Sequence, residues 1–235
     1  KRRRKVYPLG QTLQIRAGDQ EPVRQQEVTV SPEEAGRLEL TLAGENVHVE
    51  PSPDGAIHVF YTVTDRRTYD VSLRDGVWSF ARRPDNNWWL LSLRFRARQE
   101  AVTLQLPADF SGELSVKTAS GDVDISGAAA EALSVKTASG DVNISGAAAE
   151  ALSVKTASGA VALGDVQADQ LQAETTSGDM ELEALTARTL SLAAASGDVS
   201  LRRGALEALT AATVSGDMAL EDVTVRGGAA MSATS

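Results

Sequence analysis

The stretch LSVKTASGDVDISGAAAEA, residues 114–132, is followed at once by LSVKTASGDVNISGAAAEA, residues 133–151. The two copies differ only at Asp124 and Asn143. A Ser-Gly pair then recurs every nineteen residues, beginning at Ser120, Ser139, Ser158, Ser177, Ser196 and Ser215. A constant period of this size is typical of a solenoid, in which each repeat forms one coil and stacks on the previous coil.

Alternating residue types within each repeat predict two short strands. Leucine stands six residues before each of those serines, with Val, Ala or Leu two positions later and Thr or Ala four positions later. A second alternating pair follows the Ser-Gly turn, as in Val123 and Ile125. Both patterns have the period of two that is typical of a strand with one buried face.

A third, shorter side of the coil is predicted from Ala128, Ala147 and Val166. The segment GAAAEAL contains good helix formers, but seven residues are too few for a stable helix. We therefore predict an all-β, single-chain parallel β-solenoid (β-helix) with about nineteen residues per coil. Right-handed winding is expected, because parallel crossovers nearly always have that hand.

A repeated Gly-Asp pair marks the coil corner. Its members are Gly121 and Asp122, Gly140 and Asp141, Gly178 and Asp179, Gly197 and Asp198, and Gly216 and Asp217. We expect the glycines to adopt a positive φ and the aspartates to accept hydrogen bonds from turn amides. Stacked carboxylates about 5 Å apart could instead bind Ca²⁺. Because calcium-binding solenoid repeats are richer in Gly, turn capping is favoured, and no metal or other cofactor is predicted.

The first part of the chain has a different composition. All ten aromatic residues lie within the first 110 positions. Residues 1–98 hold 16 basic and 13 acidic side chains, whereas residues 99–235 hold 7 and 19. We divide the chain into a basic tail and polar segment (1–36), irregular early β-coils with an aromatic-rich cap (37–113), and regular coils (114–235) truncated within a repeat. A cap is expected because an open solenoid end exposes core and strand edges.

Two strand pairs are predicted in the early part. Alternating segments at 37–50 and 56–63, joined by a Pro-Asp-Gly turn, are expected to form either a hairpin-like or a coil-like pair of strands. The segments at 69–73 and 77–80 flank an Arg-Asp-Gly turn.

Composition and motifs limit the chemistry of the chain. There is no cysteine, so neither a disulfide framework nor thiolate chemistry is available. The sequence contains no run of eighteen or more apolar residues, which is the length needed to span a membrane. No nucleophile elbow, phosphate-binding loop or zinc-binding helix motif occurs either. No enzymatic activity is predicted. The block KRRRK at Lys1–Lys5 is interpreted either as a solvated tail or as the flank of a membrane helix outside this chain.

The candidate interaction residues stand around a pair of tryptophans. Trp88 and Trp89 follow a polar Pro-Asp-Asn-Asn segment, among Arg82, Arg83 and Arg94. A loop of this composition could contact a protein partner or a membrane surface. The alternatives are stacking on single-stranded nucleic acid, which is not the expected partner, and a structural role in which the tryptophans plug the solenoid end.

Two further groups of residues have competing interpretations. Lys117, Lys136 and Lys155 form a column of like charge, which is either a tolerated surface or a stripe for an anionic ligand. His48 and His58 lie in the segments on either side of the turn at 51–55, and if those strands pair and the two side chains face each other, they could ligate a metal. Two ligands fall short of the three or four that a metal site usually has, so surface histidines are favoured.

The repeat LxVxTxSGDVxI and the opening LELTLAGENVHVE at 38–50 together carry a resemblance. The sequence resembles the bacterial putative-adhesin family of β-strand-repeat proteins, also called toastrack-type domains, over residues 37–235. The resemblance implies a β-solenoid of the bacterial cell envelope, often attached to a membrane segment, with no established activity and no catalytic residues. Ala160 departs from the pattern, since Asp is expected there.

The leading functional hypothesis is a non-enzymatic, adhesin-like scaffold of the bacterial envelope that binds a protein partner or forms a homo-oligomer. Membrane attachment would come from a segment absent from this chain. A polysaccharide-binding or carbohydrate-active β-helix and a nucleic-acid-binding protein are the alternatives.

Overall fold

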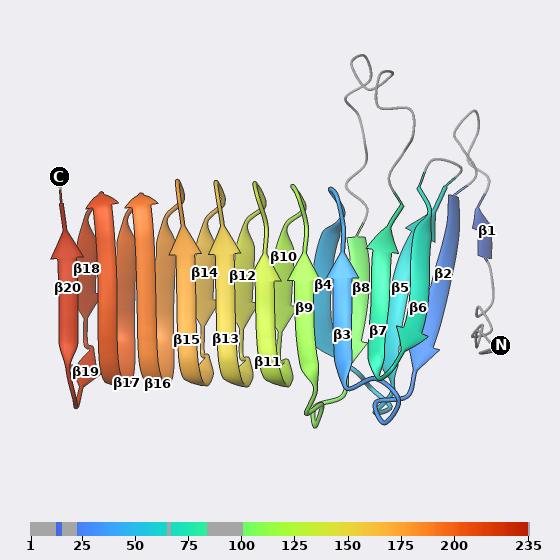
Figure 1. Ribbon diagram of the computed structural model, residues 1–235, viewed down its shortest axis with the longest axis horizontal. Coiled ribbons are helices and arrows are strands. Elements are labelled where there is room, and N and C mark those ends of the chain that lie inside the picture. The colour runs from blue at the N-terminus through green and yellow to red at the C-terminus, as the bar shows by residue number, and fades with distance from the viewer. Residues whose placement is uncertain (1–12, 16–22, 65–66, 84–100, 235) are drawn as a thin grey trace, which may run out of the picture.

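The computed structural model describes residues 13–15, 23–64, 67–83 and 101–234. Every element in these residues is a strand, and the strands join in one sheet that winds into a rod (Figure 1). The N-terminal strands are β1 (Leu13–Ile15), β2 (Val23–Val30), β3 (Arg37–Thr41), β4 (Asn46–Pro51), β5 (Ile57–Val63), β6 (Tyr69–Arg74), β7 (Val77–Arg82) and β8 (Ala101–Leu106).

The regular coils contain the remaining strands. These are β9 (Glu113–Lys117), β10 (Val123–Ser126), β11 (Ala129–Lys136), β12 (Val142–Ser145), β13 (Ala148–Thr156), β14 (Val161–Gly164), β15 (Gln167–Thr175), β16 (Met180–Ser196), β17 (Val199–Ser215), β18 (Met218–Glu221), β19 (Thr224–Val225) and β20 (Ala229–Ala233). Within these coils, paired residues stand nineteen positions apart, for example Leu133 with Leu152 and Val142 with Val161, except in β20, whose residues pair with β17 at a spacing of twenty. The predicted coil length is therefore confirmed.

Each coil has three sides. Face 1 is the ladder β7, β3, β9, β11, β13, β15, the later parts of β16 and β17, and β20. Face 2 is the ladder β8, β4, β10, β12, β14, the first parts of β16 and β17, and β18. The short side joins them, beginning at Ala129 in β11 and ending at β19. In Figure 1 the strands of face 1 form the front row and point the same way.

The core of the regular coils consists of the predicted inward columns. The six leucines that precede the Ser-Gly pairs, Leu114, Leu133, Leu152, Leu171, Leu190 and Leu209, are each at most 2 % exposed. Val135, Val142 and Ile144 are equally buried beside them. Since a coil has no second layer of its own, these side chains are covered mainly by the coils above and below.

The N-terminal coils are not stacked in chain order. The coil made by β3 and β4 lies between β7 and β8 on one side and β9 and β10 on the other. β5 pairs antiparallel with β2 and β8, so the predicted pairing of segments 37–50 and 56–63 is wrong, because β8 lies between β4 and β5. The predicted hairpin of β6 and β7 is confirmed, with Asp75 and Gly76 at positive φ in its turn.

An aromatic cluster fills the N-terminal end of the rod, as the composition predicts. The rings of Tyr69 and Trp78 stack on Phe80 at centroid distances of 4.6 and 5.8 Å, and Tyr61 meets Phe80 edge-on at 4.9 Å. Trp78 and Phe80 are completely buried. These large rings take the place that small aliphatic side chains occupy in the regular coils.

Candidate functional site

The first corner of the early regular coils is held by a buried threonine. Thr137 Oγ1 accepts a hydrogen bond from the Gly140 N–H at 3.0 Å, and Thr156 Oγ1 accepts one from the Gly159 N–H at the same distance. Thr156 also donates to the Gly140 carbonyl of the previous coil at 3.4 Å. The hydroxyl therefore satisfies backbone groups of two coils at once, which explains why a polar residue recurs in an apolar column.

The corner glycines are required by close approach rather than by a left-handed conformation. A Cβ placed on Gly140 would lie 1.9 Å from the carbonyl oxygen of Gly121, and one on Gly121 would lie 1.9 Å from that of Glu45. The expected positive φ is wrong for Gly121, Gly140, Gly159 and Gly178 and occurs only at Gly197 and Gly216, with φ of 152° and 156°. Stacked corners thus leave no room for a side chain.

The corner aspartates form a chain of hydrogen bonds between coils. Asp122 Oδ1 accepts from the Asp141 N–H at 3.1 Å, and Asp141 Oδ1 accepts from the Ala160 N–H at 2.8 Å. Asp179 and Asp198 accept in the same way from the coils that follow them, at 2.9 and 2.8 Å. The expected turn cap therefore acts on the next coil. No group of three His, Cys, Asp or Glu side chains that could hold a metal occurs among the described residues.

The second corner contains the left-handed residues that the sequence does not reveal. Its positions repeat every nineteen residues and all have φ between 52° and 62°: Gly127, Gly146, Asp165, Ala184, Arg203 and Asp222. Glycine adopts this conformation at little cost, whereas Ala and Arg do not. The first two coils therefore have the favourable residue, and the later coils have lost it.

Glu45 is a buried carboxylate at the first corner of the β3–β4 coil. It is 2 % exposed, and its Oε2 accepts from the N–H groups of Ala43 and Gly44 at 3.1 and 3.2 Å. Its Oε1 accepts from Tyr69 Oη at 3.2 Å and from Arg82 Nη1. Burial alone would raise the pKa of Glu45, but these donors outweigh it and hold the pKa below its usual range. The same burial, together with the Glu45 charge, raises the pKa of Tyr69.

The structure places two of the five candidate interaction residues. Arg82 is bound to the buried Glu45, and Arg83 forms an exposed ion pair with Asp70. The hydrogen bond to Asp70 raises the pKa of Arg83. Trp88, Trp89 and Arg94 lie outside the described residues, so their role in binding stays a prediction.

The two histidines do not come together. His48 Nδ1 lies 3.2 Å from Asp124 Oδ2, whereas His58 contacts Glu27 through Nδ1 at 3.1 Å and Asp54 through Nε2 at 2.9 Å. The condition for a metal site, that the two histidines face each other, is not met, because β8 separates their strands. The hydrogen bond from His58 lowers the pKa of Asp54 to about 2.

Charged columns run along both borders of face 1. Lys117, Lys136 and Lys155 stand at successive ladder positions near the first corner, and we name them the basic ridge. Glu131, Glu150 and Asp169 recur every nineteen residues where the short side meets face 1, and we name them the acidic ridge. A shallow groove of about 820 Å³ runs beside the acidic ridge along the short side, floored by Ala129, Ala130, Ala148, Ala149 and Ala168.

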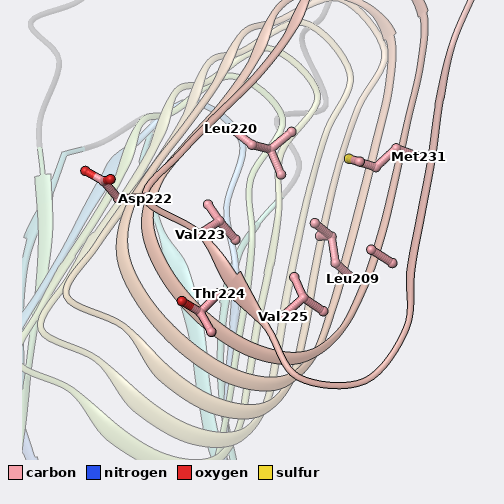
Figure 2. A pocket seen from close by; sticks show the side chains of 8 residues that line it. Leu209, Leu220, Asp222, Val223, Thr224, Val225 and Met231 are labelled. Carbon is pink, nitrogen blue, oxygen red and sulfur yellow. The ribbon is translucent and has the colours of Figure 1, made fainter.

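The last described coil surrounds a hollow. Figure 2 shows Leu209, Leu220, Val223, Val225 and Met231 directed into the interior of the last coil, around a hollow of about 540 Å³. Met231 is 57 % exposed, although its column is buried in earlier coils. β20 pairs in parallel with β17.

With this geometry established, the chain can be compared with known proteins. The model of the family described as Toastrack DUF4097 matches residues 35–235. The chain belongs to the Toastrack DUF4097 family. No curated protein matches this Toastrack chain.

Two solved structures are similar to this Toastrack chain. One, described as a putative adhesin from Bacteroides fragilis, has a TM-score of 0.55 and 16 % identity, covering 89 % of this chain and 96 % of its own. The other, a putative adhesin from Parabacteroides distasonis, has a TM-score of 0.51 and 14 % identity, covering 92 % and 98 %. At these identities the likeness shows the fold alone. Neither the family nor these structures indicate a catalytic function.

A search of the described residues for membrane spans finds no helix of sufficient length and apolar character.

Proposed function

We propose that this chain is a non-enzymatic, adhesin-like scaffold of the bacterial cell envelope that binds another protein, or a second copy of itself, through its flat sheet faces. The observation that carries the proposal is the continuity of faces 1 and 2, which are ladders of strands in register. Extended flat surfaces suit protein partners, whereas small molecules are usually bound in concave pockets.

The use of the polar residues supports a role without catalysis. The corner Thr hydroxyls and Asp carboxylates accept hydrogen bonds from backbone N–H groups. The Glu45 carboxylate likewise accepts hydrogen bonds from groups of the same chain. Residues used in this way stabilise the coil stack. The description of similar structures as adhesins supports a surface or envelope location, and attachment through a membrane segment outside this chain belongs to the same proposal.

The proposal is tested with photo-crosslinking residues at two outward positions in cells of the bacterium that makes the protein. Ser134 reports on face 1 because it lies between two buried residues of β11 and so faces outward. Asn143 reports on face 2 because it has the same position in β12. We expect the protein in the envelope fraction, with a light-dependent crosslink from at least one face to a protein. Cytoplasmic location without crosslinks would contradict the proposal. Binding to a glycan panel without protein crosslinks would favour the polysaccharide alternative.

A further inference from the structure

Part of the basic ridge and part of the acidic ridge are left without a neutralising partner. Among the described residues, Lys117, Lys136, Glu131 and Glu150 form no ion pair. In-register neighbours stand about 4.8 Å apart, so like charges within each ridge repel. Such columns weaken the isolated rod unless something outside it supplies the opposite charge.

The later coils show how the same columns are neutralised elsewhere. Arg188 continues the acidic ridge and lies 3.2 Å from Asp169 and 3.9 Å from Glu207. Glu174 continues the basic ridge and lies 2.8 Å from Lys155. Alternating signs therefore neutralise the later part of both ridges within the chain. The contrast singles out the coils of β9, β11 and β13.

The two ridges are placed so that they complement each other. Glu131 and Lys136 stand at opposite ends of the part of β11 that crosses face 1, and Glu150 and Lys155 do the same on β13. Five residues of strand separate the two charges by about 16 Å. The outward side chains between them are small, namely Ala132, Ser134, Ala151 and Ser153. Two such surfaces can therefore approach closely.

We propose that face 1 binds a second copy of this chain, with the two rods parallel and related by a twofold axis that runs along the rod. This inference rests on the proposed function and names its partner. The rotation exchanges the two borders of face 1 and keeps each coil at the same height. Lys136 then faces Glu131 of the second copy, and Lys155 faces its Glu150. A second copy is favoured over another protein because one molecule carries both complementary ridges.

Charge also selects the orientation of the dimer. A twofold axis directed along the strands, and so perpendicular to the rod, would place basic ridge on basic ridge, which like-charge repulsion opposes. In the proposed arrangement Glu174 and Asp169 meet at the next height, but Lys155 and Arg188 already neutralise them within each chain. The interface is therefore polar and isologous, and its affinity depends on salt.

The test is a charge-swap experiment on the full chain, followed by analytical ultracentrifugation at low and high salt. One variant carries Lys136→Glu and Lys155→Glu, and the other carries Glu131→Lys and Glu150→Lys. We expect the wild-type chain to dimerise and its dimer to weaken at high salt. Each variant alone should dimerise at least about tenfold more weakly, because it meets like charges. An equimolar mixture of the two variants should restore the dimer, since each supplies the charge that the other lacks.

The control variant is Glu181→Lys, which changes an exposed charge on face 2 and should leave the dimer unchanged. Circular dichroism of all variants confirms folding. A wild-type chain that stays monomeric at millimolar concentration and low salt would overturn the inference, as would a mixture that stays monomeric. Either result leaves the proposed envelope function standing if the crosslinks reach another protein, so the two failures are distinguishable.

Discussion

The N-terminal coils and the regular coils share one sheet, but different kinds of contact hold them together. From β11 onward, each coil stacks on the coil that precedes it in the chain, and the same corner contacts recur. Before β9, the β3–β4 coil is inserted between coils that are distant in sequence, and a single buried carboxylate joins several strands. The comparison shows that repetition spreads stability over many equivalent bonds, whereas an irregular end concentrates it in a few.

The largest expected effect comes from deleting one coil in each region. Removal of residues 133–151 should leave a shorter, cooperatively folded rod, because the nineteen-residue register is preserved. Removal of residues 37–51 should prevent folding, because β9 and β10 lose the strands that separate them from β7 and β8. Circular dichroism and gel filtration check both results. Equal tolerance of the two deletions would show that the N-terminal order is not essential.

The buried carboxylate offers the next largest effect. Glu45→Ala should lower the free energy of unfolding by about 3–5 kcal/mol, because it removes the buried carboxylate that accepts hydrogen bonds from Tyr69 and Arg82. The control is Glu113→Ala, which removes an exposed ion pair with Arg37 and should cost less than about 1 kcal/mol. Urea unfolding measures both. Similar losses for the two variants would mean that the Glu45 contacts contribute little.

Two glycines of the regular coils test whether the close approach of stacked corners requires glycine. Gly140→Ala should cost about 2–3 kcal/mol, since its Cβ would meet the Gly121 carbonyl oxygen at 1.9 Å. Gly164→Ala meets no atom within 4 Å and should be neutral or stabilise by up to about 1 kcal/mol. Thermal unfolding of both variants is the measurement. A neutral Gly140→Ala would show that the corners can separate without loss.

The left-handed corner predicts a substitution that stabilises the drifted coils. Ala184→Gly should raise the free energy of unfolding by about 0.5–1 kcal/mol, because Ala184 has φ of 56°. Ala208→Gly, at a half-buried strand position, should lower it by a similar amount. Opposite signs in urea unfolding would support the assignment, and two losses would contradict it.

The smallest expected effect concerns the exposed Asp54. Its pKa of about 2 means that the ionised carboxylate stabilises the N-terminal coils above pH about 4, and this contribution is lost as the pH falls toward 2. An NMR titration of the side chain should give a midpoint near 2. In a His58→Gln variant the midpoint should rise toward the ordinary range of an aspartate, because the main donor is gone. An unchanged midpoint would remove His58 from the explanation.

The regular coils could be predicted from the sequence because the period places every residue by its distance from a Ser-Gly pair. The buried leucines and the third side follow from that rule, and both are confirmed. The family rests on a resemblance carried by the repeat motif and the opening segment at 38–50, and it is confirmed as well. The insertion of β3 and β4 could not be foreseen, since alternation identifies strands but not their distant partners. The reason for the corner glycines was predicted wrongly. A sequence does not show whether a glycine is needed for a positive φ or because a neighbouring carbonyl group leaves no room for a Cβ.

The candidate site was less predictable for similar reasons. The sequence analysis did not single out Glu45. The available signal was that Glu45 stands two residues before Val47, where the regular coils have the corner glycine, as in Gly121 before Val123. The left-handed position at the second corner could not be recognised from the sequence. It is glycine only in the first two coils, at Gly127 and Gly146, and Asp165, Ala184 and Arg203 occupy it in the next three. The lysine column was recognised as repulsive, but its acidic counterpart became visible only when the structure placed both on the borders of one face.

The near-identical copies at 114–151 also bear on how such a molecule changes between generations. A copying event that adds or removes nineteen codons would alter the rod by about 4.8 Å and create no unfamiliar contact. Length would thus be inherited as a whole number of coils. Natural variants of this rod are expected to differ in length by complete nineteen-residue coils.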